Sequence, residues 1–444
     1  RGIIQDFQDF FRCLILEMLI RPQAPAKKIP YLTPMQYLST FILFASMLVS
    51  AHASRAIGTH SLRNNEAVNE KIQTGADQTD QYLPYLKGKR VAMVINATST
   101  IGAKSSVDSL LALGVRVVKI MGPEHGFYGN ASNGAKVANS VDPKKGIPII
   151  SLYGKHFKPT KEDLDGVDIV VFDMQDVGAR FYTYISTLHY VMEACAEHNL
   201  ELMVWDRPNP NGFYVDGPVL EEKFKSFVGM HPVPIVHGMT IAEYAQMING
   251  EGWLNNKVTC KLKIIKLKNY NHQSSYTLPI APSPNLNTQQ SILLYPSLCL
   301  FEGTVISVGR GTYFPFQVLG NPELKMKYDF SFTPQGIKGM SETPLHQNTL
   351  CYGIDLRKYD VEKIYNARQL NLDWLITLYR AYPFKEKFFD YTQSKQMGNF
   401  DRLAGTDQLR KQIIAQQSEQ EIRLSWEPAL SHYKLMRAQY LLYK

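Results

Sequence analysis

The sequence predicts an α/β protein, in which a doubly wound parallel sheet is joined to a second, smaller α+β domain and the two form a cleft. Two observations predict this fold class. First, continuous apolar runs recur along the first half of the chain and alternate with helical patterns, as in a parallel sheet covered on both faces. Second, the sequence from residue 251 onward is rich in proline, glycine, serine and aromatic residues.

The expected strands are short and rich in branched apolar residues. They cover residues 90–96, 115–121, 147–154, 167–173 and 200–206. Amphipathic patterns at 105–114 and 181–199 predict helices between them. Strands and helices that alternate in this way are typical of a Rossmann-like domain, which we expect at residues 81–250.

The second domain is expected at residues 251–444. Its first segment, KVTCKLKIIKLKNY, alternates like a half-exposed strand. Two helix-like segments follow in the C-terminal part, at 371–382 and 406–417. The mixture of strand and helix patterns predicts the α+β class for this domain.

The N-terminal region has the pattern of an export signal. Met35 precedes an almost uncharged apolar run at residues 38–49, which ends shortly before Ala51, His52 and Ala53. A short apolar core closed by small residues is typical of a secretory signal peptide, here cleaved after Ala53. The alternative, an uncleaved N-terminal anchor, is disfavoured because the run is short for a membrane span.

This pattern predicts an exported protein, periplasmic or secreted, with no stable membrane span after signal cleavage. Residues 1–53 are interpreted as the signal peptide and a segment upstream of it, which suggests a start site placed too early. Residues 54–80 are polar and aperiodic, and they are expected to form a leader into the first domain.

Charge and motifs exclude several functional classes. The chain of 444 residues has a formal net charge of +8. No block of lysine and arginine stands out, so nucleic acid is not an expected partner. The glycine-rich fingerprints G-x-G-x-x-G and G-x-x-x-x-G-K-[ST] are both absent, and no cofactor is expected.

The cysteines after residue 53 are Cys195, Cys260, Cys299 and Cys351. Their wide spacing is not that of a zinc ribbon or a thioredoxin-like site. An even number of cysteines in an exported protein permits disulfides. Cys195 lies inside a helical pattern and is expected to be a small buried apolar residue.

Charged side chains follow three of the expected strands, at the edge where ligands bind to open parallel sheets. The set consists of Glu124 and His125 after the second strand, Asp173, Gln175, Asp176 and Arg180 at the end of the fourth, and Asp206, Arg207 and Asn209 at the end of the fifth. A turn or a helix cap explains one such acid easily, but it explains a row of them poorly. The sequence therefore predicts a functional site at this edge.

Two of these acids also have structural interpretations. Asp176 can orient Arg180 four residues later. Asp206 can pair with Arg207 or cap the following turn. For any single acid, the structural and the functional interpretation stay open at this point.

A second polar set lies further along the chain. His237 precedes a helix in which Thr240 and Glu243 have capping-box spacing, which favours a structural role for those two. Glu302 and Arg310 lie in glycine-rich loops that allow close approach of a ligand. Aromatic side chains able to stack on sugars are Tyr182, Tyr184, Tyr295, Tyr313, Phe314 and Phe316, although core packing is the favoured interpretation for most of them.

Several carboxylates, amides and aromatics without a cofactor suit glycoside hydrolysis. That reaction needs one carboxylic acid to protonate the leaving oxygen and a second group to support the oxocarbenium-like transition state or to activate water. Metal binding by His125, Asp173 and Asp206 is the alternative, since histidine and aspartate at three strand ends can converge.

Eight motifs resemble one family throughout. They are GPEHGFYGN, SLYG, FDMQDVGARFYTYI, WDRPNPNG, SFVG, VHGMTIAEYAQM, APSPNLNT and FEGTVISVGRGTYFPF. The chain resembles the exo-β-N-acetylmuramidase family of peptidoglycan recycling from about residue 82 to the C-terminus. The resemblance implies two domains around a cleft and exo-hydrolysis of non-reducing terminal N-acetylmuramic acid from peptidoglycan fragments (muropeptides and oligosaccharides).

The resemblance also assigns roles. It implies Glu124, Asp173 and Asp176 as catalytic residues, with Glu124 as the general acid. It implies substrate binding by His125, Gln175, Arg180, Tyr182, Asp206, Arg207, Asn209, His237, Glu302 and Arg310. No metal ligand is expected. The chain departs from the family pattern at Ala135, where an acidic residue is common, and at Ala242, where glycine is usual, which bears on substrate preference.

Three hypotheses follow. The leading one is an exported glycosidase that releases N-acetylmuramic acid, whose lactyl carboxylate needs a cation from Arg180, Arg207 or Arg310. The second is a non-catalytic muropeptide- or sugar-binding protein that uses the same cleft. The third is a metal-dependent hydrolase, which would lose activity with a chelator.

Overall fold

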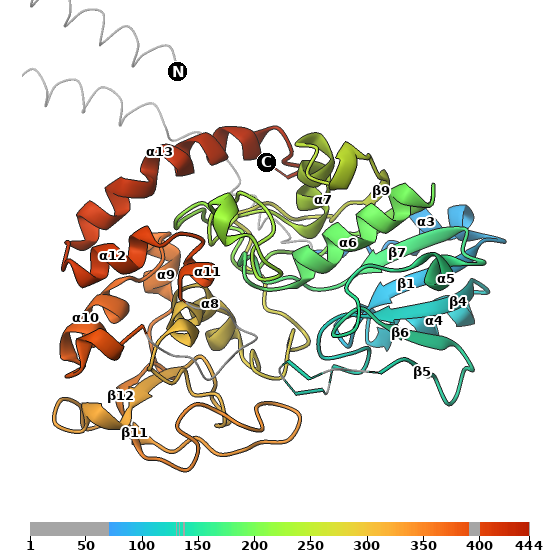
Figure 1. The fold of residues 1–444 in the computed structure, drawn as a ribbon. Helices are drawn as coiled ribbons and strands as arrows, with labels where there is room; N and C mark the ends of the chain where they lie inside the picture. The colour runs from blue at the N-terminus through green and yellow to red at the C-terminus, as the bar shows by residue number, and fades with distance from the viewer. Residues whose placement is uncertain (1–70, 130, 133, 136–137, 390–399, 444) are drawn as a thin grey trace, which may run out of the picture. The chain divides into compact units, whose positions relative to one another are not determined.

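A computed structural model describes residues 71–129, 131–132, 134–135, 138–389 and 400–443 (Figure 1). The predicted signal peptide and most of the predicted leader lie outside these residues. Among the described residues, no helix has the length and the apolar character needed to cross a bilayer.

A seven-stranded sheet forms the first part of the fold, with the strand order β5-β6-β4-β1-β7-β8-β9. Every pairing in it is parallel except that of β5 with β6. The strands are β1 (Arg90–Ile95), β4 (Arg116–Gly122), β5 (Ser140–Val141), β6 (Pro148–Ser151), β7 (Ile169–Asp173), β8 (Glu201–Trp205) and β9 (Lys261–Ile265). A short hairpin, β2 (Thr100–Ile101) and β3 (Lys104–Ser105), follows β1. The predicted parallel sheet is therefore confirmed.

Helices cover both faces of this sheet, as the doubly wound fold requires. Alternate residues of β1 enter opposite cores: Val91 and Met93 pack with the helices on one face, and Ala92 and Val94 pack with those on the other. The first face carries α3 (Thr79–Leu86) and α4 (Ser106–Ala112), and the second carries α6 (Tyr184–Glu197) and α7 (Ile241–Gly250), with α5 (Lys161–Leu164) between β6 and β7 (Figure 1).

The segment at 261–265 differs from its expected place. It forms β9, which pairs with β8 as the edge strand of the parallel sheet rather than within the second domain. Leu262 and Ile264 pack on one core cluster and alternate with Lys261 and Lys263, which accounts for the alternating pattern. The boundary at residue 250 itself stays a prediction.

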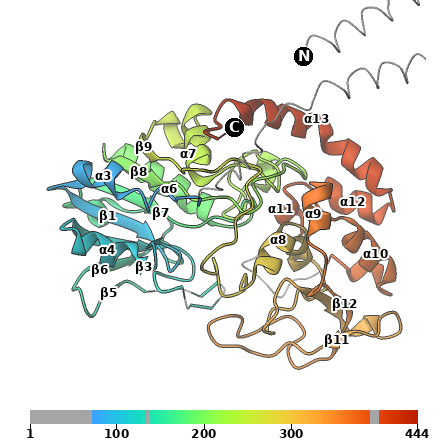
Figure 2. The same cartoon turned by 180° about the vertical axis from the view of Figure 1, so that it is seen from behind.

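The second part of the fold is smaller and mixed, as expected. Its antiparallel sheet has the order β10-β12-β11, with β10 (Val318–Asn321), β11 (Ser331–Phe332) and β12 (Cys351–Asp355). Its helices are α8 (Gln289–Leu298), α9 (Glu362–Ala367), α10 (Asp373–Ala381), α11 (Phe400–Ala404), α12 (Gln408–Ile414) and α13 (Glu419–Ala438) (Figure 2). The helix predicted at 371–382 is α10, and that predicted at 406–417 is α12.

The longest helix, α13, was not predicted. Ser418 begins it with a capping box to Glu421, and its buried residues follow a helical spacing: Ile422, Trp426, Leu430 and Tyr433. Both signals are present in the sequence, but Pro428 interrupts the pattern. Apolar residues of α13 join the same core cluster as α6 and α7, so the two parts of the fold share one apolar interior.

Candidate active site

The carboxyl ends of β4, β7 and β8 lie along one edge of the sheet. β1 pairs with both β4 and β7, and β7 pairs with β8, all in parallel. Asp173 ends β7, Asp206 follows β8, and Glu124 comes two residues after β4. The expected row of acids is therefore assembled at this edge, although its members have very different surroundings.

The turn that carries Glu124 has an unusual backbone. His125 has a φ of 68° and Gly126 a φ of 73°, so two successive residues occupy the left-handed region. The buried His125 ring holds its place through Nδ1, which lies 2.9 Å from the carbonyl oxygen of Ala131. Gly122 lets the chain after the turn pass close to the end of β4, since a Cβ at this position would lie 2.8 Å from the backbone nitrogen of Phe127. The turn thus presents Glu124 in one fixed backbone position.

Glu124 is half-buried and accepts hydrogen bonds from two sides. The hydroxyl of Thr183 donates to Oε2 at 3.1 Å, and the backbone N–H of Gly134 donates to Oε1 at 3.2 Å. Thr183 precedes α6, the helix that follows β7. Sequence reasoning did not single out Thr183, although it lies inside the motif FDMQDVGARFYTYI.

Asp173 and Arg207 form a fully buried ion pair. Nε of Arg207 lies 2.6 Å from Oδ1 of Asp173, and Nη2 donates to the carbonyl oxygen of Thr100 at 3.0 Å. Burial raises the pKa of Asp173, against the attraction of the guanidinium. This pair joins β7 to the loop after β8, so both side chains are engaged within the fold.

Asp206 supports the start of α7 and the end of the chain. Its Oδ2 accepts hydrogen bonds from the hydroxyls of Thr240 at 2.7 Å and Tyr443 at 2.6 Å. Its Oδ1 accepts from the backbone N–H groups of Arg207 and Ala242, each at 3.0 Å. Burial raises the pKa of Asp206 to about 7. Pairing of Asp206 with the Arg207 guanidinium is not realised, since that group faces Asp173, and the helix start that Asp206 caps is that of α7 rather than the turn directly after it.

Asp176 and His237 face each other at the same edge. Oδ2 of Asp176 accepts from the backbone N–H of Gly178 at 2.7 Å and lies 3.6 Å from Nε2 of His237. Nδ1 of His237 accepts from the backbone N–H of Met239 at 3.2 Å, so the neutral ring carries its proton on Nε2, toward Asp176. Oδ1 of Asp176 has no hydrogen-bond partner among the described residues.

The phenol of Tyr184 is buried and is influenced by the charges of both Asp176 and Glu124. Burial raises the pKa of the Tyr184 phenol, and the negative charges of Glu124 and Asp176 add to this effect. The hydroxyl of Tyr184 donates to the carbonyl oxygen of Pro282 at 3.2 Å and accepts from Nδ2 of Asn96 at 2.6 Å. Among the described residues, the hydrogen bonds of this phenol are to Asn96 and Pro282 rather than to either carboxylate.

Three other predicted residues brace the loops of the site. Gln175 donates to the carbonyl oxygens of Asp176 at 2.8 Å and Pro208 at 2.7 Å. Asn209 donates to the carbonyl oxygen of Met239 at 2.9 Å, and Tyr182 donates to that of Pro282 at 2.9 Å. All three side chains are buried, so they fix the backbone around the carboxylates.

Arg180 lies away from Asp176, which was considered as its partner. Its guanidinium is fully buried and donates to three backbone carbonyls, those of Pro218 at 2.9 Å, Val233 at 2.7 Å and Leu403 at 2.9 Å. Burial lowers the pKa of Arg180 to about 9. The interpretation of Asp176 as its orienting partner is therefore wrong.

Glu302 and Arg310 form a pair in the second part of the fold, through Nε of Arg310 and Oε1 of Glu302. The guanidinium also lies over the ring of Phe316, 5.0 Å from its centre. The Arg310 side chain keeps 15% of its surface exposed, compared with 3% for Arg207. Among the described residues, the hydrogen bonds of Glu124 are to Thr183 and Gly134 and do not involve this pair.

Most of the aromatic residues considered for stacking belong to the core. Buried side chains are Tyr182, Tyr184, Tyr295 and Phe316. Tyr313 is 77% exposed, and Phe314 is partly buried against Val318 and Phe332. These four rings pack in the core cluster of the fold.

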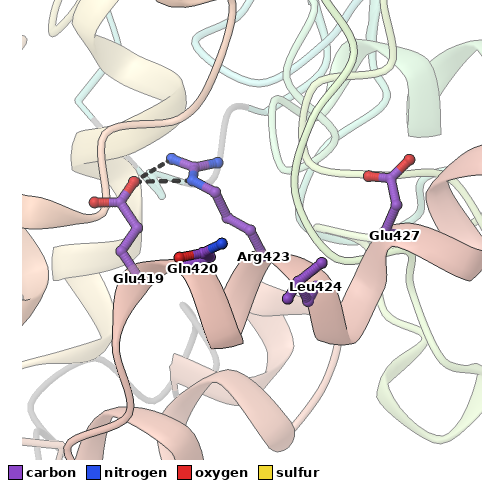
Figure 3. Close-up of a pocket in the computed structure, with 5 residues that line it drawn as sticks. All are labelled: Glu419, Gln420, Arg423, Leu424 and Glu427. Atoms are coloured by element: carbon purple, nitrogen blue, oxygen red, sulfur yellow. Dashed lines mark hydrogen bonds and ion pairs between the residues drawn. The ribbon is translucent and has the colours of Figure 1, made fainter.

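Other features lie apart from the sheet edge. In the described part of the chain, no three histidine, cysteine or acidic side chains are grouped as a metal ion would need, so His125, Asp173 and Asp206 do not converge. The four described cysteines are buried free thiols, as expected for Cys195. A surface cavity on α13 is lined by Glu419, Gln420, Arg423, Leu424 and Glu427 (Figure 3), none of which belongs to the predicted site.

Comparison with known proteins gives a consistent result over the length of the fold. The family model described as exo-beta-N-acetylmuramidase NamZ, N-terminal, matches residues 91–290, and the corresponding C-terminal model matches residues 293–443. The peptidoglycan beta-N-acetylmuramidase NamZ of Bacillus subtilis (strain 168) is 38% identical over 420 residues, which are 91% of this chain and 99% of that protein.

Two crystal structures of DUF1343 family proteins from Bacteroides fragilis NCTC 9343 have the same fold. One is 44% identical with a TM-score of 0.77, and the other is 29% identical with a TM-score of 0.71. Each match covers 84% of this chain and 99% of the other. The chain therefore belongs to the exo-β-N-acetylmuramidase family, and it is a glycoside hydrolase.

Proposed function

We propose that the protein releases non-reducing terminal N-acetylmuramic acid from peptidoglycan fragments, with Glu124 as the general acid. The observation that carries this proposal is the position of Glu124. Among the four acids at the sheet edge, Glu124 alone is half-exposed, whereas Asp173, Asp176 and Asp206 are buried. A proton donor has to reach the substrate, so Glu124 is the acid best placed to do so.

The surroundings of Glu124 suit proton donation to a leaving group. As the bond between the sugar C1 and the glycosidic oxygen breaks, the proton of Glu124 moves to that oxygen and the carboxyl group becomes negatively charged. The donors from Thr183 and Gly134 then stabilise this charge. Water attacks C1 to complete hydrolysis, and its proton has to pass to a base.

Asp176 is the second carboxylate in this proposal. Asp206 is held by four donors, and Asp173 is paired through Oδ1 with the buried guanidinium of Arg207, so both acids are engaged within the fold. Oδ1 of Asp176 and Oδ2 of Asp173 both lack a hydrogen-bond partner among the described residues, but Asp176 has no guanidinium paired with it as Asp173 has. These facts support Asp176 as the group that assists the oxocarbenium-like transition state or activates water.

Arg310 is the proposed partner of the lactyl carboxylate of the substrate. Arg180 is enclosed by backbone carbonyls, and Arg207 is paired inside the fold. Arg310 keeps part of its surface exposed in a glycine-rich loop, and a guanidinium can bind a carboxylate through two parallel hydrogen bonds.

Purified protein and a chromogenic β-glycoside of N-acetylmuramic acid test this function. We expect the wild-type protein to release the chromophore, and Glu124→Gln to lose about 100- to 10,000-fold in kcat/KM, the usual contribution of a general acid. Undiminished activity of Glu124→Gln would contradict the role of Glu124. Binding without turnover would favour a sugar-binding protein, and loss of activity with a chelator would favour a metal-dependent hydrolase.

The exo mode has its own test. Two disaccharides are compared. The first has N-acetylmuramic acid at its non-reducing end, and the second has it at its reducing end, so the linkage class is the same but the terminal sugar differs. We expect cleavage of the first only. Equal cleavage of both would contradict recognition of the terminal sugar.

The site of action is also a proposal. We infer export through the apolar segment at 38–49, which lies outside the described residues. Expression of the full chain in a bacterial host followed by N-terminal sequencing of the periplasmic or secreted protein tests it. A mature protein beginning at Ser54 is expected, and retention of the intact chain in the cytoplasm would contradict it.

A further inference from the structure

Tyr153, the tyrosine of the motif SLYG, has no role among the site residues named so far, and it lies beside Glu124. β4 and β6 pair in parallel, and their register aligns Gly122 with Ser151. The backbone N–H of Leu152 extends this alignment by donating to the carbonyl oxygen of Gly122 at 2.8 Å. Glu124 and Tyr153 are each two residues beyond the aligned pair. The register therefore places Tyr153 next to Glu124 at the edge of the sheet.

The backbone and the ring of Tyr153 are both fixed. The hydroxyl of Ser151 accepts from the backbone N–H of Tyr153 at 3.3 Å and donates to its carbonyl oxygen at 3.0 Å. The Tyr153 ring meets Phe157 edge-on with centres 5.7 Å apart and Phe227 at 6.0 Å. Phe157 and Phe227 pack on each other at 4.2 Å. This aromatic group leaves the ring little freedom to turn away from the edge.

The phenol of Tyr153 is close enough to Glu124 for the two groups to interact. Burial raises the pKa of the Tyr153 phenol, and the negative charge of the Glu124 carboxylate and a hydrogen bond to it add to this effect. The phenol therefore keeps its proton at neutral pH. The Thr183 hydroxyl and the Gly134 N–H already donate to this carboxylate, and the Tyr153 phenol is the third polar group beside it.

We propose that Tyr153 is a positioning residue for Glu124, whose phenol O–H orients the carboxyl group and stabilises the carboxylate that remains after the proton has passed to the leaving oxygen. This inference rests on the proposed function of Glu124 as the general acid. Only the Glu124 proton is transferred. Tyr153 keeps its own proton throughout, so its hydrogen bond strengthens as the negative charge develops on Glu124.

A series of leaving groups tests this role. A phenyl glycoside needs protonation of its leaving oxygen, whereas a dinitrophenyl glycoside departs as a stable anion and needs almost none. For Tyr153→Phe we expect kcat/KM to fall about 10- to 100-fold with the phenyl glycoside, as for loss of a hydrogen bond to a charged group. With the dinitrophenyl glycoside the fall should stay within about threefold.

Tyr190→Phe is the matched control. Tyr190 stacks on Phe157 in the same aromatic group, with ring centres 6.3 Å apart, so this variant removes an equal hydroxyl from the same surroundings. We expect it to leave the activity on both glycosides unchanged. Glu124→Gln should show the same dependence on the leaving group as Tyr153→Phe, only larger.

The outcomes separate the two proposals. An active wild-type protein with a Tyr153→Phe variant of full activity would overturn the role of Tyr153 and leave that of Glu124 intact. An equal loss with both glycosides would also overturn it, because a general structural defect does not depend on the leaving group. If the wild-type protein releases no N-acetylmuramic acid at all, the proposed function itself fails.

Discussion

The hydroxyl of Tyr443 donates a hydrogen bond of 2.6 Å to Oδ2 of Asp206, which anchors the end of the chain at the carboxyl end of β8. The same hydroxyl accepts from the backbone N–H of Leu267 at 2.9 Å, and the N–H of Leu442 donates to Glu243 at 2.8 Å. The last residues that the structure describes are thus part of the framework that holds the candidate active site.

Tyr443→Phe tests this anchor. The change removes one donor from a buried carboxyl group and one acceptor from a buried N–H, and we expect the free energy of unfolding to fall by about 1–3 kcal/mol. Urea unfolding measures the difference. Tyr440→Phe is the control, because the Tyr440 hydroxyl donates to Glu251 at 2.7 Å in a half-exposed place. Equal free energies of unfolding for Tyr443→Phe and the wild type would show that these hydrogen bonds do not contribute to stability.

Asp206 predicts a pH dependence of stability. Its pKa is raised by burial to about 7 in the folded protein, from an ordinary value of 3.8. Between these values the unfolded chain loses the proton while the folded protein retains it, so stability falls as the pH rises from about 4 to 7. The slope from this group is about 1.4 kcal/mol per pH unit, and it vanishes above the folded pKa.

Asp206→Asn removes this titration. Urea unfolding at several values of pH between 4 and 8 should show a flatter dependence for the variant than for the wild type. Because burial also raises the pKa of Asp173, that carboxyl group contributes in the same direction in both proteins. Parallel curves for the two proteins would contradict the assignment to Asp206.

Arg180 is predicted to act on stability rather than on substrate binding. In Arg180→Met the carbonyl oxygens of Pro218, Val233 and Leu403 lose their donor, and we expect a loss of about 2–4 kcal/mol. The KM of the folded fraction should not change. Arg357→Met is the control, since Arg357 pairs with Asp355 at the surface and should contribute at most about 1 kcal/mol. A large rise in KM for Arg180→Met would instead indicate substrate contact.

Arg310 is predicted to select the lactyl group. We expect Arg310→Gln to raise the KM for the N-acetylmuramic acid glycoside about 10- to 100-fold, the effect of losing a hydrogen bond to a charged group. Hydrolysis of the N-acetylglucosamine glycoside, which lacks the lactyl carboxylate, should not change. Arg410→Gln breaks a comparable pair with Asp401 and serves as the control. Equal changes with both sugars would remove Arg310 from substrate recognition.

The sequence predicted the fold where the pattern is local. Five strands of the parallel sheet and the capped helix α7 follow from apolar runs and from the capping box of Thr240 and Glu243, which the structure contains. The place of β9 depends on its pairing with β8, about sixty residues away in the chain. No local pattern reports such a pairing.

The same distinction applies to the site. The positions of Glu124, Asp173 and Asp206 at one edge follow from the parallel sheet alone. The hydrogen-bond partners of the site residues do not follow from the sheet. Asp206 is bound by Tyr443 and Arg180 by Leu403, and both partners are more than two hundred residues away in the chain. Tyr153 lies in the motif SLYG, but the sequence assigns it no role, because its place beside Glu124 depends on the register of β4 and β6.

The bond of Arg180 to Leu403 has a further consequence for the chain as a whole. The two family models divide it near residue 290, yet the guanidinium from the first half is completed by a carbonyl from the second, and one apolar cluster runs through both. Separated halves would each expose unsatisfied polar groups and apolar surface. The halves should therefore melt in a single calorimetric transition, and when expressed as two fragments they should yield soluble protein only on co-expression.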